Sequence, residues 1–215
     1  ETLGSPQPFR LHTLPIFAYD HKDNSPSKKY LVAGWGAMWE HINRFTVAGK
    51  GHFYEMLQEG VPLRLFYDID LPPDTVDFDG VVSTVISTTN ECLGFDAVPI
   101  VLDATSTKKK SRHLVYPNVV FADMDHIKRF VGHVVSQIND LPSNSSFPIG
   151  AGIDTGVYTK DRLLRVLGSS KRTPNLAPAR RFSFMDGSAW NVHNFFRTLV
   201  SPYALRLEAG CSPQG

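Results

Sequence analysis

The sequence contains little cysteine, no long apolar run and no excess of charge of either sign. Cys92 and Cys211 are the only cysteines among 215 residues, which excludes a disulfide framework or a multi-cysteine zinc site and favours a reducing compartment. No apolar segment is long enough to cross a membrane and no signal peptide is recognisable, so we expect no membrane partner. The 22 basic and 21 acidic residues nearly cancel. A charged ligand must therefore be recognised by a local cluster rather than by net charge.

What the chain does contain is a succession of short apolar segments separated by turn residues. A chain of this length can bury one substantial core, and we expect a single unit over residues 1–215, with a smaller N-terminal α/β lobe over about residues 1–62. In this lobe the pattern predicts a short edge strand at residues 14–19, a strand at 30–33, and helical segments within 34–59, broken near 49–51.

The residue pattern from about residue 63 to residue 207 predicts an α+β fold of RRM-like type with a C-terminal extension. Strand and helix patterns follow the order β-α-β-β-α-β, which is the split βαβ arrangement. This arrangement forms an antiparallel sheet with helices on one face, so we expect the opposite face to be open to ligands. The expected segments are a strand at 63–71, a helix from Asp79, strands at 99–105 and 111–121, a helix capped by Asp123 or Asp125, a strand at 150–158 and its return strand at 163–167.

The strand at residues 63–71 carries two acids, Asp68 and Asp70, in an otherwise apolar segment that ends at Pro72-Pro73. Side chains alternate along a strand, so the two acids share one face, about 7 Å apart. Two such carboxylates repel each other and are costly to bury unpaired. A divalent cation such as Mg²⁺ or Mn²⁺ removes that cost. The alternative is that Asp70 caps the turn and Asp68 is an exposed edge residue.

A second polar face is expected where Lys109, Ser111 and His113 recur at a spacing of two residues. An ammonium, a hydroxyl and an imidazole on one strand face can all donate hydrogen bonds to oxygen, which suits a polyphosphate. The alternative is that Lys109 is a solvated turn residue and His113 is a core histidine bonded to the backbone.

The third polar segment begins at Asp154, an acid inside an apolar segment that needs a partner or a metal. A dense basic set follows it, namely Arg162, Arg165, Lys171 and Arg172. The alternative is a solvated hairpin with surface charges, although the spacing puts Asp154 centrally and the cations on the rim.

Together the three segments resemble the motifs of the primase-polymerase branch of the archaeo-eukaryotic primase superfamily, over residues 28 to about 175. The motifs occur here as Asp68-Ile69-Asp70, as Ser111-Arg112-His113, and as Asp154 followed by Gly156-Val157-Tyr158-Thr159, Arg165 and Ser169-Ser170-Lys171. Members of this family often carry Glu where Asp70 stands. Because Asp is one methylene shorter, a metal must sit slightly deeper here.

The resemblance implies that Asp68, Asp70 and Asp154 are catalytic acids that hold two Mg²⁺ or Mn²⁺ ions. One ion would activate a primer 3′-hydroxyl and the other would hold the incoming triphosphate. By the same resemblance, the triphosphate is gripped by Lys109, Ser111, His113, Arg165 and Lys171.

Further residues are implied as contacts of the nucleic acid or nucleotide. Lys28, Lys29, Arg162 and Arg172 are expected to bind nucleic acid. Tyr54 is either a contact to the nucleotide sugar, where its ring excludes a 2′-hydroxyl, or simply a core residue.

The resemblance therefore predicts a template-directed nucleotidyltransferase, a DNA polymerase or primase that uses DNA template, primer and nucleoside triphosphate in damage-tolerant synthesis. We expect a monomer in the nucleus or mitochondrion. Many members carry a cysteine/histidine zinc module, which the two distant cysteines of this sequence cannot form. Either the module lies beyond residue 215 in the full protein or this member never had it, and this weakens the case for de novo priming more than for primer extension. The alternatives are a non-catalytic RRM-like module that stacks single-stranded bases on exposed aromatics, and a metal-dependent nuclease, which has less use for a triphosphate grip.

Overall fold

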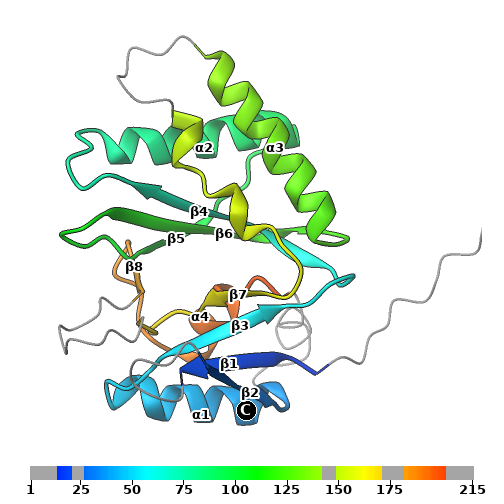
Figure 1. The fold of residues 1–215 in the computed structure, drawn as a ribbon, viewed down its shortest axis with the longest axis vertical. Helices are drawn as coiled ribbons and strands as arrows, with labels where there is room; N and C mark the ends of the chain where they lie inside the picture. The colour runs from blue at the N-terminus through cyan, green and yellow to red at the C-terminus, as the bar shows by residue number, and fades with distance from the viewer. Residues whose placement is uncertain (1–13, 21–26, 142–148, 171–181, 202–215) are drawn as a thin grey trace, which may run out of the picture.

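The computed structural model describes residues 14–20, 27–141, 149–170 and 182–201. These residues form two antiparallel four-stranded sheets and four α-helices, which confirms the predicted α+β fold (Figure 1). The first sheet has the strand order β2-β1-β3-β7, with the bounds Lys28–Val32, Ile16–Asp20, Phe53–Leu57 and Arg162–Arg165. The second has the order β4-β6-β5-β8, with the bounds Leu63–Leu71, Lys110–Phe121, Ile100–Asp103 and Ser183–Phe184.

Two helices, α2 (Phe78–Leu93) and α3 (Met124–Asp140), cover one face of the second sheet (Figure 1). Asp77 and Asp123 cap these helices, since each side chain accepts a backbone N–H of the first turn. The order β4-α2-β5-β6-α3, with β6 paired between β4 and β5, is that of the split βαβ motif. None of the described helices is long and apolar enough to cross a membrane.

The fourth strand expected in this motif is reduced to one residue. Ile153 forms an isolated antiparallel bridge with Ile69 of β4. The prediction of a strand over residues 150–158 is therefore wrong. The segment instead forms two short 3₁₀ turns, η1 (Ile149–Gly152) and η2 (Thr155–Val157).

Local chemistry explains why this segment does not pair as a strand. A Cβ added at Gly152 would come within 2.8 Å of the Leu71 side chain, so the backbone passes directly against β4. The Asp154 carboxylate accepts the N–H of Gly156 at 2.9 Å. Such a side-chain bond to the nearby backbone favours a turn over a sheet ladder.

The expected return strand at 163–167 also pairs elsewhere. It appears as β7, which is antiparallel to β3 in the first sheet, with Arg165 opposite Tyr54. β3 itself lies in the segment expected to be helical, where only α1 (Trp35–Val47) forms a helix. β1 is not an edge strand, because it pairs with β2 on one side and β3 on the other.

The two sheets face each other, and α1 lies on the far side of the first sheet (Figure 1). On the inner face of the second sheet, Phe66 is fully buried and Leu102 is 2% exposed. Leu102 belongs to one apolar cluster with Phe17 and Phe53 of the first sheet. The sheet face that we expected to be open to ligands is therefore largely covered by the first sheet.

Two buried residues, Arg64 on β4 and Glu55 on β3, attach the end of α4 (Val192–Arg197) and the residues that follow it to both sheets. Arg64 Nη1 donates to three backbone carbonyls within residues 196–199, at 2.9 to 3.3 Å. The Glu55 carboxylate accepts the backbone N–H groups of Val200 and Ser201 at 2.8 and 3.1 Å. These bonds hold the later part of the chain against the strands that carry the predicted site.

Candidate active site

The pairing of β4 with β6 brings the first two predicted motifs directly opposite each other. Asp68 is paired with His113, and Asp70 is paired with Ser111. Across the gap between the sheets, β3 and β7 contribute Tyr54 and the arginines. One cavity of about 140 Å³ is lined by nine of the predicted site residues, namely Tyr54, Asp68, Asp70, Lys109, Ser111, His113, Asp154, Arg162 and Arg165.

The two acids of β4 are only partly neutralised by their neighbours. Asp70 is ion-paired with Lys109. Asp68 Oδ1 lies 3.1 Å from His113 Nε2, and Asp70 Oδ1 is buried with no hydrogen-bond partner. Burial opposes ionisation of Asp68, but His113, Lys109 and Arg165 outweigh it and hold its pKa below the ordinary value. Asp70 therefore keeps one buried carboxylate oxygen without a donor, and Asp68 Oδ1 faces the imidazole of His113.

Asp154 is fixed beside Asp68 through its backbone. Its N–H donates to the Asp68 carbonyl at 2.9 Å, while its exposed carboxylate accepts the N–H of Gly156. Within the residues that the structure describes, no three His, Cys, Asp or Glu side chains are gathered closely enough to hold a metal ion. The third acid thus lines the same cavity as Asp68 and Asp70, with its carboxylate turned to its own loop.

The cationic side of the cavity centres on Arg165. Burial lowers the pKa of its guanidinium, whereas the neighbouring Tyr54, Asp68 and Asp70 raise it. Its Nε is buried with no hydrogen-bond partner. Arg165 therefore brings a half-buried positive charge to the wall opposite the two acids.

Tyr54 lies at the cavity in contact with one of the predicted nucleic-acid residues. Its hydroxyl donates to Asp20 Oδ2 at 3.1 Å, and Lys28 Nζ sits 4.0 Å from the centre of its ring. Lys28 is also ion-paired with Asp20. Burial, reinforced by Asp20, raises the pKa of the Tyr54 hydroxyl, so the ring stays neutral. With 9% exposure, Tyr54 both packs in the core and faces the cavity.

Two of the predicted residues that the structure describes, Lys28 and Lys29, do not line this cavity. Lys28 and Lys29 lie on β2, one strand beyond β1 and two beyond Tyr54. Lys171 and Arg172 lie outside the described residues.

One residue at this site was not predicted. The ring of Phe182 lies 4.3 Å from the His113 ring and 4.2 Å from Arg165 Cζ. Phe182 follows a Pro- and Arg-containing segment with no periodic pattern, so the sequence offered no signal for its position.

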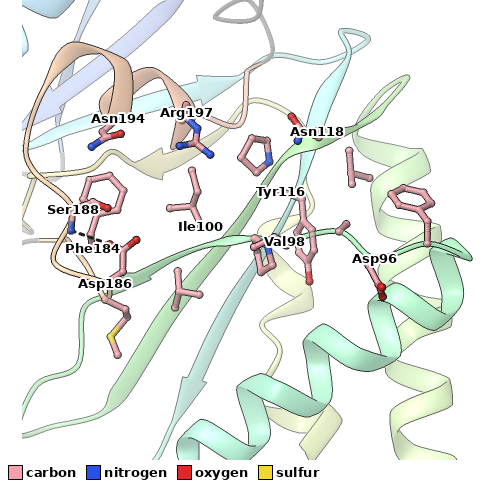
Figure 2. Close-up of a pocket in the computed structure, with 17 residues that line it drawn as sticks. Asp96, Val98, Ile100, Tyr116, Asn118, Phe184, Asp186, Ser188, Asn194 and Arg197 are labelled. Carbon is pink, nitrogen blue, oxygen red and sulfur yellow. Dashed lines mark hydrogen bonds between the residues drawn. The ribbon is translucent and has the colours of Figure 1, made fainter.

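A larger cavity, of about 480 Å³, is shown in Figure 2, and the acids of β4 are not among the residues that line it. Asn194 and Arg197 reach toward it from α4, above apolar residues that include Ile100 and Phe184. None of the predicted site residues that the structure describes lines this larger cavity.

No family model matches the chain. The chain is 27% identical over 188 residues to a candidate primase of Ostreid herpesvirus 1 (isolate France), covering 73% of this chain and 16% of that protein. It is 22% identical over 210 residues to the DNA-directed primase/polymerase protein of Danio rerio, covering 75% and 40%. It is 24% identical over 152 residues to the same-named protein of Gallus gallus, covering 64% and 26%. The chain thus spans less than half the length of each relative. These relatives confirm the resemblance to primase-polymerases that the motifs indicate.

Proposed function

We propose that this chain is the catalytic core of a template-directed nucleotidyltransferase, which transfers a nucleotide from a nucleoside triphosphate to the 3′-hydroxyl of a DNA primer. The names of the relatives support a primase- or polymerase-type activity. The observation that carries the proposal is the gathering of two partly buried carboxylates, Asp68 and Asp70, with the cations of Lys109 and Arg165 in one cavity, where one oxygen of Asp70 has no hydrogen-bond donor.

The acids of β4 fit a divalent cation. Buried carboxylate oxygens without donors are costly unless a cation meets them, and hard cations such as Mg²⁺ and Mn²⁺ prefer oxygen ligands. We expect Asp68 and Asp70 to hold such ions, with Asp154 beside them. When bound, the ions would lower the pKa of the attacking hydroxyl and neutralise the triphosphate.

The donors that surround the acids fit a polyanion. Lys109, Ser111, His113 and Arg165 converge on the cavity, and charge-assisted hydrogen bonds from such groups to phosphate oxygen are among the strong ones. A donor set that is held in place before the reaction stabilises charge at the transferred phosphorus. Lys171 is proposed to join this set on the motif resemblance alone.

The size of the cavity limits which parts of the nucleotide can enter it. Its volume of about 140 Å³ is well below the roughly 300 Å³ at which ordinary ligand pockets begin. We infer that phosphate groups and ions enter it while the sugar and base remain at its mouth, on the side of Tyr54. Lys28, Lys29, Arg162 and Arg172 are proposed as contacts of the nucleic-acid backbone.

We propose that the enzyme tolerates damaged templates, because the small cavity leaves few walls around the base. Synthesis across a lesion-containing template, measured by primer extension, tests this part of the proposal, and a stall at every lesion counts against it. Action on DNA in the nucleus or mitochondrion, as a monomer, is part of the same proposal.

The RRM-like binding module is the weaker candidate. It needs exposed aromatics on the sheet face opposite the helices, and on this face Phe66 is fully buried. A pure binding module should also bind single strands equally well with and without Mn²⁺, whereas the acids of this cavity repel phosphate unless a cation is present.

The experiment that tests the proposal is incorporation of a labelled nucleotide on a DNA template, with and without primer, in Mg²⁺ and in Mn²⁺. We expect the Asp68→Ala, Asp70→Ala double variant to lose incorporation by about 10³-fold or more, since several kcal/mol of charge stabilisation disappear. Asp74→Ala is the matched control, because Asp74 is an exposed acid that follows the same strand and does not line the cavity. Wild-type rates in the double variant would contradict the assignment.

A further inference from the structure

The ring of Phe182 contacts two basic side chains that line the cavity, those of His113 and Arg165. The centres of the Phe182 and His113 rings are 4.3 Å apart with their planes inclined by 53°, and Arg165 Cζ lies 4.2 Å from the centre of the Phe182 ring. Phe182 is only 2% exposed and is not among the residues that line the cavity. It thus touches two proposed phosphate ligands without facing the ligand itself.

The backbone fixes the position of this ring. The N–H of Phe182 donates to the Ser169 carbonyl at 3.1 Å, and the N–H of Gly168 donates to the Phe182 carbonyl at 3.0 Å. Gly168 has φ of 76°, and a Cβ there would lie 2.6 Å from the Thr46 side chain, so the turn requires glycine. Phe182 is therefore anchored to the end of the third motif independently of what its ring contacts.

The contact with Arg165 is one that an aromatic ring makes and an aliphatic side chain does not. The face of an aromatic ring attracts a guanidinium group electrostatically, and stacking on the ring fixes the orientation of the planar guanidinium. Arg165 Nε is buried with no hydrogen-bond partner, so this stacking contributes to holding the group. The imidazole of His113 packs on the same ring, while its Nε2 lies 3.1 Å from Asp68 Oδ1.

We propose that Phe182 is a positioning residue, whose ring holds Arg165 and His113 in the orientation that binds the triphosphate. The inference rests on the proposed function, since it concerns the same cavity. Phe182 acts through the two basic side chains, and its loss raises the KM for nucleotide more than it lowers kcat.

Steady-state incorporation by Phe182→Leu tests this role. Leucine keeps an apolar side chain in the core and removes the ring face. A lost cation–π contact at a desolvated site corresponds to about a tenfold rise in the KM for nucleotide, and we expect kcat to stay within about threefold. Phe195→Leu is the matched control, because Phe195 is equally buried in the same apolar cluster and contacts Trp39 and Trp190 instead. An equal KM in the two variants would overturn the proposal.

A second measurement does not depend on catalysis. In the ligand-free protein, the ring current of Phe182 should shift the side-chain Nε–Hε proton of Arg165, and this shift should vanish in Phe182→Leu and persist in Phe195→Leu. An unchanged Arg165 resonance in Phe182→Leu would contradict the positioning role. Failure of the wild-type protein to incorporate any nucleotide would instead contradict the proposed function, and the NMR comparison would still decide whether the Phe182 ring lies against Arg165.

Discussion

The buried carboxyl of Glu55 should make the stability of the fold depend on pH. Glu55 is 3% exposed on β3, next to Tyr54. Burial raises its pKa from the ordinary 4.5 to about 7, although hydrogen bonds from Val200 and Ser201 and the charge of Arg64 lower it. Because the folded-state pKa is above the unfolded value, the folded protein retains a proton between pH 4.5 and about 7 that the unfolded chain releases.

The direction of the effect follows from proton linkage. The free energy of unfolding falls as pH rises wherever the folded state binds more protons. The interval between the two pKa values, at about 1.4 kcal/mol per unit, gives a loss of about 3 kcal/mol from pH 4.5 to 7 and no further loss above that. Glu55→Gln removes this ionisation and should remove the loss.

Urea denaturation at a series of pH values measures the effect. The difference in unfolding free energy between wild type and Glu55→Gln should change by about 3 kcal/mol between pH 4.5 and 7. Comparing the two proteins at each pH cancels the contributions of the other titrating groups. Glu59→Gln, at an exposed glutamate ion-paired with Lys160, should run parallel to wild type. Parallel curves for wild type and Glu55→Gln would refute the reasoning.

Two further predictions concern the buried arginine and the histidine of the cavity. Arg64→Met leaves three carbonyls within residues 196–199 without their donor and Glu55 without its nearby cation, so it should cost about 3–5 kcal/mol in urea denaturation; a cost below about 1 kcal/mol would contradict this. His113→Ala should raise the KM for nucleotide with a smaller loss of kcat in steady-state incorporation. An unchanged KM with a lost kcat would contradict the role of His113 as a ligand of the triphosphate.

The pair of strands that carries the first two motifs was predictable from local pattern. β4 and β6 are apolar segments bounded by turn residues, and α2 and α3 begin at acids that cap them. The alternation of side chains on a strand placed Asp68 with Asp70, and Ser111 with His113, on single faces. Pairing of the two strands then brings these faces together, because the predicted order already made them neighbours.

The remaining parts of the fold depend on contacts between distant segments. β7 is short and reads as the return strand of a hairpin, but its partner β3 lies more than a hundred residues earlier. Arg64 reads as an ordinary charged residue within an apolar strand, and its acceptors are carbonyls more than 130 residues away. Neither pairing leaves a periodic signal in the sequence.

The central claim is that Asp68 and Asp70 hold a divalent cation, and direct binding of Mn²⁺, followed by electron paramagnetic resonance, tests it without any assay of activity. Titration of the wild-type protein should show bound Mn²⁺, and the Asp68→Asn, Asp70→Asn double variant should bind it at least about tenfold more weakly, while Asp74→Asn binds as the wild type does. Equal affinity in all three proteins, or no binding to the wild type, would contradict the account.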